Sequence, residues 1–446
     1  MYRRIDFSKL ALVSGLCLAA QPALAGYEFK EGDLSGSVNL NAGAATISTH
    51  GVNFGTGKID SRSGENEGTN ARWQEFYIKP GITLQYQLNP DFQLLGGASV
   101  MGATTFGDGD AGGNTRSSDG AARWEELYAG FQAGDWKFTA GRQNYLVGNG
   151  FIVMDGNLDA LDKGAYWLGP RTAFNDSAIL GWSQGALQAQ AFTLRADDDL
   201  IGDYRMTGAN IDYAIEGVGK FGAMAFRVNS EVPRGDEVFP RDGKQVYNLR
   251  ALGVKVPGIP ALTLDGEYAV QKGNGHGGIE YDAKAWYLQG DYAFTQTPWP
   301  VNLGYRYLVY SGDDDVTDNT VKAWDPLSKG FTGWGTWLVG DIMGNYLLFN
   351  SNERVQQFYV KNQLTETVAL GAIHYQFWLD EKNFLGAPVS ERRFADESVL
   401  YLDWTPTDRW YASLSYNWAK PKGAAKEFFG DNNTFSALEL YVLYHY

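Results

Sequence analysis

The sequence is short of several features that other classes of protein need. Its one cysteine is Cys17, so the rest of the chain can carry no disulfide framework. Leu16 stands before it, where a lipoprotein signal needs a small residue, so lipidation is not expected. Beyond residue 25 there is no run of 18 apolar residues, and we therefore expect no transmembrane helix. The four histidines are far apart, which predicts no metal site and no bound cofactor.

The first 25 residues have the pattern of a secretory signal peptide. Arg3, Arg4 and Lys9 form a basic region, and residues 10–20 are an apolar stretch too short to span a bilayer. Residues 23–25 read Ala-Leu-Ala, which is the small-x-small pattern that signal peptidase cuts. We expect 1–25 to be a signal peptide and 26–446 to be a single domain.

Positive charge is also scarce. The chain has 37 Lys and Arg against 52 Asp and Glu, a net charge of −15. Removing residues 1–25 takes away three basic residues and one acidic residue, which moves the charge to −17. A chain this acidic lacks the basic footprint of a nucleic-acid-binding protein, so no nucleic-acid partner is expected.

Aromatic residues and glycine are abundant instead. Aromatic residues make up 14% of the chain, and 55 residues are glycine. Aromatic side chains favour strands, whereas glycine favours turns and tightly curved sheet. The composition predicts an all-β protein, although an acidic secreted sandwich would share it.

Alternation of apolar and polar residues favours a membrane barrel over a sandwich. At the C-terminus one face carries Leu438, Leu440, Val442, Tyr444 and Tyr446, as in strands with one face toward lipid. A last strand that ends on an aromatic residue resembles the signal read by the outer-membrane assembly machinery. The same period predicts strands at 35–48, 72–88, 92–106, 120–132, 136–143, 176–183, 186–195, 204–216, 218–230, 246–256, 260–272, 280–295, 299–311, 353–364, 367–379, 397–404, 409–418 and 434–446.

The connections between these eighteen segments alternate in length. Tight turns such as 89–91, 133–135, 184–185 and 406–408 alternate with long loops. The long loops are 49–71, 144–175, 231–245, 312–352 and 419–433. The sequence predicts a transmembrane antiparallel β-barrel of about 18 strands, with short periplasmic turns and long extracellular loops. Such a protein lies in the outer membrane of a Gram-negative bacterium, with membrane lipid, lipopolysaccharide and the assembly machinery as partners.

Charged residues on the inward face are the candidates for function. The alternation places both basic and acidic side chains on the inward face. Each of them either forms an ion pair within the wall or belongs to an electrostatic filter for solute. The alternation also predicts that His374 faces inward. Outer-membrane barrels that are enzymes use Ser and His on the outer wall, so we expect no enzyme. The inward basic residues are Lys79, Arg195, Arg227, Arg250, Arg306 and Lys361. The inward acids are Glu75, Asp212, Asp265, Glu267, Asp291, Asp403 and Glu439.

Two long loops have unusual composition. Loop 144–175 is mostly apolar and aromatic, so we expect it to fold into the barrel and narrow it. Arg142, just before it, points toward lipid by phase unless its strand bulges. Loop 312–352 opens with acids between Asp313 and Asp318. Their spacing fails the calcium-loop pattern, so a solvated acidic loop is the better interpretation.

Several short motifs together resemble the alginate-export family of outer-membrane porins. They are Trp124-Glu125-Glu126-Leu127-Tyr128, Gly141-Arg142-Gln143, Pro170-Arg171, Gly304-Tyr305-Arg306-Tyr307, Asp325-Pro326-Leu327 and residues 334–352. The resemblance spans roughly residues 70–446. It implies a large monomeric barrel whose arginine-lined, loop-gated constriction passes an anionic polysaccharide. By position, it makes Arg142, Arg171 and Arg306 the leading candidates for solute contact.

Two functions follow from these patterns. The first is a passive channel for an anionic oligosaccharide, polysaccharide or other anionic organic solute. The alternative is a scaffold barrel that sheathes a periplasmic redox or export partner and conducts little by itself.

Overall fold

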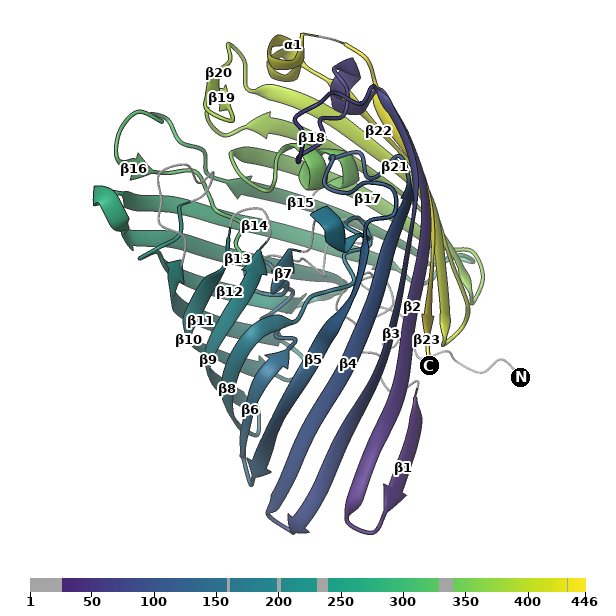
Figure 1. Ribbon diagram of the computed structural model, residues 1–446, viewed down its shortest axis with the longest axis vertical. Helices are drawn as coiled ribbons and strands as arrows, with labels where there is room; N and C mark the ends of the chain where they lie inside the picture. Colours follow the sequence, from purple (N-terminus) through teal and green to yellow (C-terminus); the bar gives the residue numbers. More distant parts are fainter. Residues whose placement is uncertain (1–25, 159–160, 199–201, 231–239, 329–339, 431) are drawn as a thin grey trace.

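The computed structural model describes residues 26–158, 161–198, 202–230, 240–328, 340–430 and 432–446. The expected signal peptide, 1–25, lies outside these residues. Twenty-one strands join one sheet, and all but three of them, β1, β7 and β16, form a ring of eighteen antiparallel strands. Each wall strand pairs with its neighbours in chain order, and the last pairs with the first (Figure 1).

The ring confirms the predicted fold class and strand count, because each predicted segment overlaps one wall strand. The wall strands are β2 (Leu34–His50), β3 (Asn70–Asn89), β4 (Phe92–Gly107), β5 (Gly120–Ala133), β6 (Trp136–Gln143), β8 (Phe174–Gln184), β9 (Leu187–Asp198), β10 (Tyr204–Ile215), β11 (Gly219–Ser230), β12 (Gln245–Val256), β13 (Ile259–Asn274), β14 (Glu280–Phe294), β15 (Val301–Tyr310), β17 (Glu353–Gln363), β18 (Val368–Leu379), β21 (Arg393–Thr407), β22 (Trp410–Pro421) and β23 (Phe435–His445).

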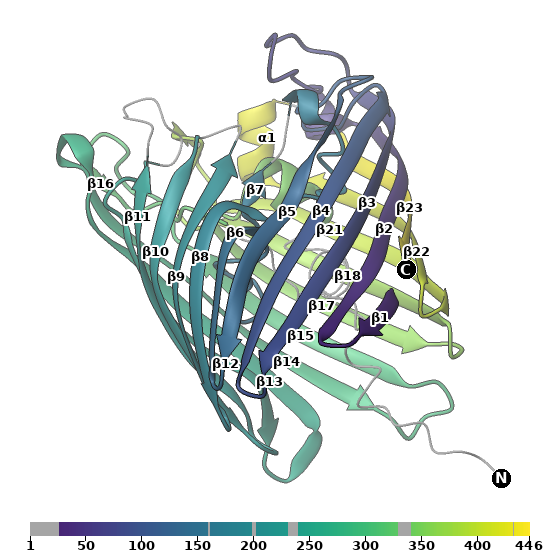
Figure 2. The same cartoon turned by 60° about the horizontal axis from the view of Figure 1, so that its bottom comes forward.

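The remaining elements are short. β1 extends β2 as a hairpin below its contact with β23, and the others lie in the loops (Figure 2). They are β1 (Tyr27–Glu31), β7 (Asn157–Leu158), β16 (Thr320–Val321), β19 (Asn383–Phe384), β20 (Ala387–Pro388), the 3-10 turns η3 (Val52–Gly55), η4 (Leu161–Lys163) and η5 (His276–Gly278), the π-helix η6 (Gly340–Leu347) and the α-helix α1 (Gly423–Phe429). Within the described ranges no helix is both long and apolar enough to cross a membrane.

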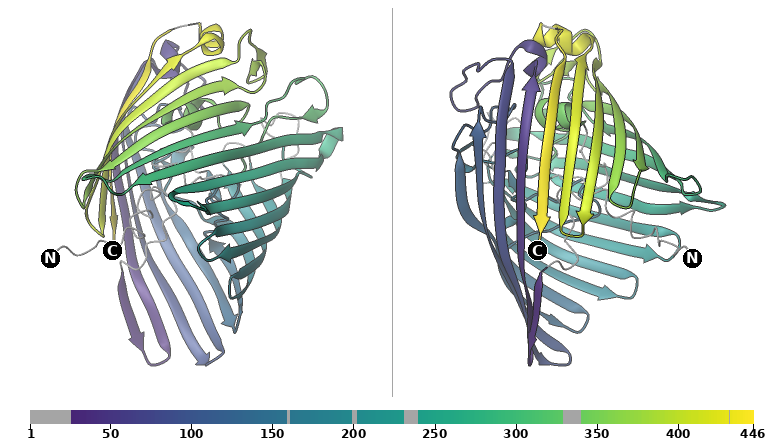
Figure 3. Two further views of the ribbon diagram at one scale, coloured as in Figure 1. Left: turned by 180° about the vertical axis from the view of Figure 1, so that it is seen from behind. Right: turned by 90° about the vertical axis from the view of Figure 1, so that its right-hand side faces the viewer.

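Long loops and short turns lie at opposite ends of the ring (Figure 3). The turn between β3 and β4 has two residues. The longest loop, between β15 and β17, runs from Tyr310 to Glu353. Some strands run further into the loop end than alternation predicted. β21, for example, begins at Arg393 and not at residue 397.

Side chains alternate between two environments along every strand. Large apolar residues such as Leu249, Leu288 and Trp124 are more than half exposed on the outer face. The residues between them are buried inside the ring, as the burial pattern of β14 shows. An outer face that exposes this much apolar surface fits hydrocarbon rather than water.

The glycine content has a packing cause inside the ring. Tyr77, Tyr359 and Tyr401 each lie flat over a glycine on the next strand, at registered positions. A Cβ added to Gly371 would come within 2.1 Å of the Tyr401 ring. Only glycine admits the ring at these positions, so large inward aromatics fit within a curved wall.

Ring closure uses the C-terminal residue itself. The backbones of Leu40 and Tyr446 exchange two hydrogen bonds of 2.8 and 2.9 Å. Arg409 lies 4.8 Å from the centre of the Tyr446 ring. The terminal aromatic is therefore part of the seam between β2 and β23.

Deleting Tyr446 should lower the yield of assembled barrel several-fold, because the seam loses both backbone hydrogen bonds and the ring. Each such bond contributes about 1 kcal/mol. Heat-modifiable mobility of membrane extracts on gels measures the yield. Tyr446→Phe keeps the backbone and the ring and should assemble as wild type. Normal assembly of the deletion variant would exclude this role for Tyr446.

Candidate functional site

The loop between β6 and β8 crosses the interior of the ring. Phe151 is 2% exposed and packs on Tyr287 of β14 and Tyr310 of β15, with ring centres 5.1 and 5.8 Å away. Asn149 donates a 2.7 Å hydrogen bond to the hydroxyl of Tyr287. β14 and β15 lie across the ring from β6. The apolar loop thus folds inward, as its composition predicted.

Two carboxylates of the wall hold this loop by its backbone. Glu75 of β3 accepts hydrogen bonds from the amides of Trp167 and Leu168, at 3.1 and 2.8 Å. Glu125 of β5 accepts from the amides of Thr172 and Ala173, at 2.9 and 3.0 Å. Both carboxylates are fully buried. They fix the returning arm of the loop against the inner wall.

The loop between β15 and β17 enters the ring and meets the first one. The amide of Met154 donates to the carbonyl of Ser328, at 2.7 Å, and a β-bridge joins Val153 to Ser328. Further along, the carboxylate of Glu397 on β21 accepts from the amides of Ile342 and Met343 in η6, at 3.1 and 2.8 Å. Buried wall carboxylates thus hold both inner loops.

A buried charge cluster joins this second loop to the loop before β12. Asp325 accepts from Arg241 at 3.0 Å and from Lys244 at 2.7 Å, and all three side chains are at most 3% exposed. Arg241 also lies over the ring of Tyr204, and Lys244 over that of Tyr281. Burial alone would raise the pKa of Asp325, but Arg241 and Lys244 more than offset that effect and lower its pKa to about 2. The carboxylate is therefore ionised at neutral pH.

Arg306 lies on the inner wall among polar and aromatic groups. Its guanidinium donates to the amide oxygens of Gln289 and Gln357, each at 2.8 Å, and lies 5.7 Å from the ring centre of Tyr287. These amide oxygens carry no formal charge. Its predicted inward phase is confirmed.

Three further predicted basic residues face inward. Arg250 pairs with Asp212 at 2.7 Å and also bonds Asn248. Lys361 pairs with Asp403 at 3.0 Å. Lys79 is half-buried on the inward face of β3. Of the two roles expected for an inward charge, a wall ion pair or a solute filter, Arg250 and Lys361 take the first.

Three basic residues do not face the lumen. The prediction was wrong for Arg227 and Arg195, because the phase of β11 and β9 buries the even-numbered residues. Arg195 pairs with Asp203 at 2.7 Å outside. Arg142 also lies outside, because it is registered with the exposed Leu127 and bonds Asn175 at 2.7 Å. The register shift beside it, between β6 and β8, does not turn it inward.

Arg171 is buried at the base of the inner loop. It is 2% exposed and donates to the carbonyl of Ala121, at 3.2 Å. β5, which carries Ala121, lies across the ring from β15, which carries Arg306. The predicted cluster of Arg142, Arg171 and Arg306 is therefore spread over three places in the wall.

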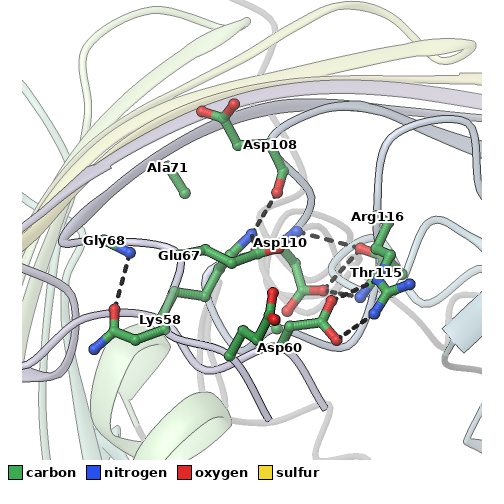
Figure 4. A network of polar contacts seen from close by, with 12 residues as sticks. Lys58, Asp60, Glu67, Gly68, Ala71, Asp108, Asp110, Thr115 and Arg116 are labelled. Carbon is green, nitrogen blue, oxygen red and sulfur yellow. Dashed lines mark hydrogen bonds and ion pairs between the residues drawn. The ribbon is translucent and has the colours of Figure 1, made fainter. Parts of the chain in front are cut away.

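A separate polar network ties two outer loops together over the rim (Figure 4). Arg116 donates to Asp60 at 2.6 Å, and Lys58 pairs with Glu67 at 2.6 Å. The hydrogen bond from Arg116 holds the pKa of Asp60 well below its usual range. Asp110 accepts from the hydroxyl of Thr115 at 2.7 Å, while burial raises its pKa. The contact between Arg116 and Asp60 joins these two loops.

The acids at 313–318 behave as loop residues. Asp313 and Asp315 accept from the amides of Asp315 and Thr317 in local turns, and Asp314 pairs with Lys322. Hydrogen bonding by Lys322 lowers the pKa of Asp314. Among the residues that the structure describes, no group of three or more His, Cys, Asp or Glu side chains is placed to hold a metal ion.

Two features found in enzymes occur in the chain, an outward His–Ser pair and a G-x-S-x-G motif. His374 faces outward, contrary to the prediction, and its Nδ1 lies 2.9 Å from the hydroxyl of Ser398. In the described part of the chain His374 makes no other hydrogen bond, so nothing there supplies a triad acid. Residues 181–185 read Gly-Trp-Ser-Gln-Gly, but they lie at the exposed β8–β9 turn and not at a strand-to-helix elbow.

Sequence reasoning missed the anchoring role of Glu125 and Glu397. Both occupy inward positions, yet they accept hydrogen bonds from loop amides instead of pairing with cations. The inward phase of each acid was the available signal. It could not show that the partners would be backbone amides far along the chain.

Comparison with known proteins supports the fold and not a particular family. No family model matches the chain, and no curated protein sequence matches it, so the resemblance to alginate-export porins gains no support there. Solved outer-membrane proteins of Pseudomonas aeruginosa do match. OpdL is 14% identical, with TM-score 0.56 over 92% of this chain and 98% of its own. OccK2 (OpdF) is 12% identical, with TM-score 0.55 over 92% and 97%. OpdK, solved with vanillate, is 13% identical, with TM-score 0.56 over 92% and 98%.

These likenesses agree with what the wall shows. The chain is a closed barrel of eighteen antiparallel strands whose outer face is apolar and whose lumen holds folded-in loops. Closed barrels with an apolar band of this kind are outer-membrane structures. The protein has the fold of an outer-membrane porin and belongs in the outer membrane of a Gram-negative bacterium.

Proposed function

We propose that the protein is a passive outer-membrane channel for small anionic organic solutes. The observation that carries this proposal is Arg306, a guanidinium on the inner wall that donates to the neutral amide oxygens of Gln289 and Gln357. Guanidinium binds carboxylates well because its planar fork can reach both oxygens. Lys79 adds positive charge to the same inner surface, whereas Arg250 and Lys361 are paired with Asp212 and Asp403.

A small solute fits this lumen better than a polymer does. The loop that carries Phe151 reaches from β6 to β14 and β15, so a long chain would have to displace it. The similarity to OpdK supports the same size class, because that protein was solved with vanillate, a small aromatic carboxylate. Passage of alginate or another anionic polysaccharide is the second form of the proposal, and it requires the inner loops to move.

The scaffold function is the alternative from a different class. Two inner loops that pack against each other would suit a barrel that conducts little and sheathes a partner. Absence of discrete channels in planar bilayers would favour it. We further propose that residues 1–25 are a removed signal peptide, that the barrel is monomeric and that the protein is not an enzyme.

Charge reversal at Arg306 tests the anionic filter. Wild type should prefer chloride over potassium, and Arg306→Glu should lower the permeability ratio about tenfold. Changing the charge by two units about 6 Å from an ion in water costs about 1.4 kcal/mol. Distant acids of the chain count less, because salt screens them over about 8–10 Å. Reversal potentials across a salt gradient measure the ratio.

Arg227→Glu is the matched control for this experiment. It makes the same change of charge on the outer face, so selectivity should stay at the wild-type value. A cation-selective wild type that Arg306→Glu leaves unchanged would contradict the anionic-solute assignment.

A further inference from the structure

A groove lies on the outer, lipid-facing wall over β8 to β13. It encloses about 870 Å³ and is lined almost entirely by apolar atoms. Its floor consists mainly of outward alanines from three adjacent strands, with Ile211 of β10 between Ala189 and Ala223. The alanines are Ala189 and Ala191 of β9, Ala209 of β10, and Ala223 and Ala225 of β11.

Large side chains stand along both edges of this alanine floor. Trp182 and Leu180 of β8 border it on one side, while Tyr247 and Leu249 of β12 border it on the other. Cross-strand registers place Leu180, Ala191, Ala209, Ala225 and Tyr247 in one continuous row. The hollow therefore follows from the contrast between small and large residues on neighbouring strands.

A basic rim closes the groove at its loop end. Arg227 lies two residues beyond Ala225 on β11, and Arg205 lies four residues before Ala209 on β10. Arg205 is registered with Asn229, so it is a diagonal neighbour of Arg227, about 7–8 Å away between Cα atoms. That spacing lets both guanidinium groups approach one anion.

The charges of this rim are only partly neutralised. Arg195 pairs with Asp203 at 2.7 Å and with Asp176 at 3.3 Å, and Arg205 reaches Asp176 at 4.0 Å. Arg227 is exposed and makes no hydrogen bond or ion pair with any residue in the described ranges. An unpaired guanidinium on a lipid-facing wall is costly unless an anion from the membrane meets it.

We propose that this groove binds a phosphorylated outer-leaflet glycolipid, the lipid A part of lipopolysaccharide. Its acyl chains lie on the alanine floor between Leu180 and Tyr247, and a phosphate lies between Arg205 and Arg227. A second copy of the chain fits less well, because a two-fold contact would bring the same arginine-rimmed patch of both subunits together. The inference needs the loop end to face the cell exterior, but it does not depend on which solute the lumen passes.

Native mass spectrometry of the delipidated protein with added bis-phosphorylated lipid A tests the site. Arg227→Ala should weaken binding about tenfold, as expected for loss of one charge-assisted contact. Ala209→Trp should abolish binding by filling the floor. Lipid A stripped of its phosphates should bind wild type about as weakly as intact lipid A binds Arg227→Ala.

Matched variants on the far wall are the controls. Ala412→Trp and Lys420→Ala make equivalent outward changes on β22 and should bind lipid A as wild type. Heat-modifiable mobility on gels confirms that each variant is folded. Channel conductance of Arg227→Ala should equal that of wild type, which separates this site from the pore. Wild-type affinity in both Arg227→Ala and Ala209→Trp, equal affinity for phosphate-free lipid A, or a dimer lost only with Ala209→Trp would each overturn the proposal.

Discussion

Excising residues 148–153 and joining the ends with two glycines is expected to raise single-channel conductance about two- to threefold. This segment carries Asn149 and Phe151 across the lumen to the far wall, so removing it opens the lumen where the loop crosses it. The arm held by Glu75 and Glu125 stays in place, because its anchors begin at Trp167. Planar-bilayer recording of the purified protein measures the change.

The control for this excision is a cut of similar size in the other inner loop. Residues 315–318 form an exposed tip, and replacing them with two glycines should leave conductance as it is. Unchanged conductance in a well-folded 148–153 variant would place the constriction elsewhere. That result would leave the assignment of the barrel fold unchanged.

Asp325→Asn is expected to destabilise the inner loops by about 3–5 kcal/mol, the usual cost of leaving buried cations without their partner. Arg241 and Lys244 would both lose the carboxylate they share. Hydrogen exchange of residues 320–328 should rise and channel openings should become noisier. Asp314→Asn, which removes an exposed ion pair on the same loop, should change neither reading.

The same cluster predicts a pH dependence with a definite sign. The folded pKa of Asp325 is about 2, below its usual 3.8, so its ionised form is favoured in the folded protein. Its contribution to stability is complete above about pH 4 and is lost as pH falls toward 2. Exchange in wild type should therefore rise below pH 4, whereas Asp325→Asn should show no such step. A wild-type loop that loosens equally at pH 5 would contradict the assignment.

The sequence predicted the wall better than the interior. Strict alternation in segments such as 438–446 predicts a strand and its faces, because one face must meet hydrocarbon. Phase was wrong for Arg195 and Arg227, whose strands carry many alanines and therefore a weak apolar pattern. In β21, by contrast, Leu400, Leu402 and Trp404 at every second position made the phase clear.

The candidate site was predicted only in part for a different reason. The alternation correctly placed Arg306, Arg250 and Lys361 on the inward face. It could not show which of these cations would form an ion pair with a wall carboxylate. Arg171 and Asp325 lie in loops, where alternation gives no information. Their contacts join positions tens of residues apart, so only the folded chain shows that Asp325 meets Arg241 rather than solvent.

The wall carboxylates that hold the inner loops also set an order of assembly. η6 follows β15 in the chain, yet its anchor, Glu397, lies on β21, three strands further round the ring. The amides of η6 have no such acceptor until β17, β18 and β21 have been added. The place of η6 in the interior is therefore fixed only after β21 has joined the wall. A chain halted before β21 would leave the amides of η6 without this acceptor.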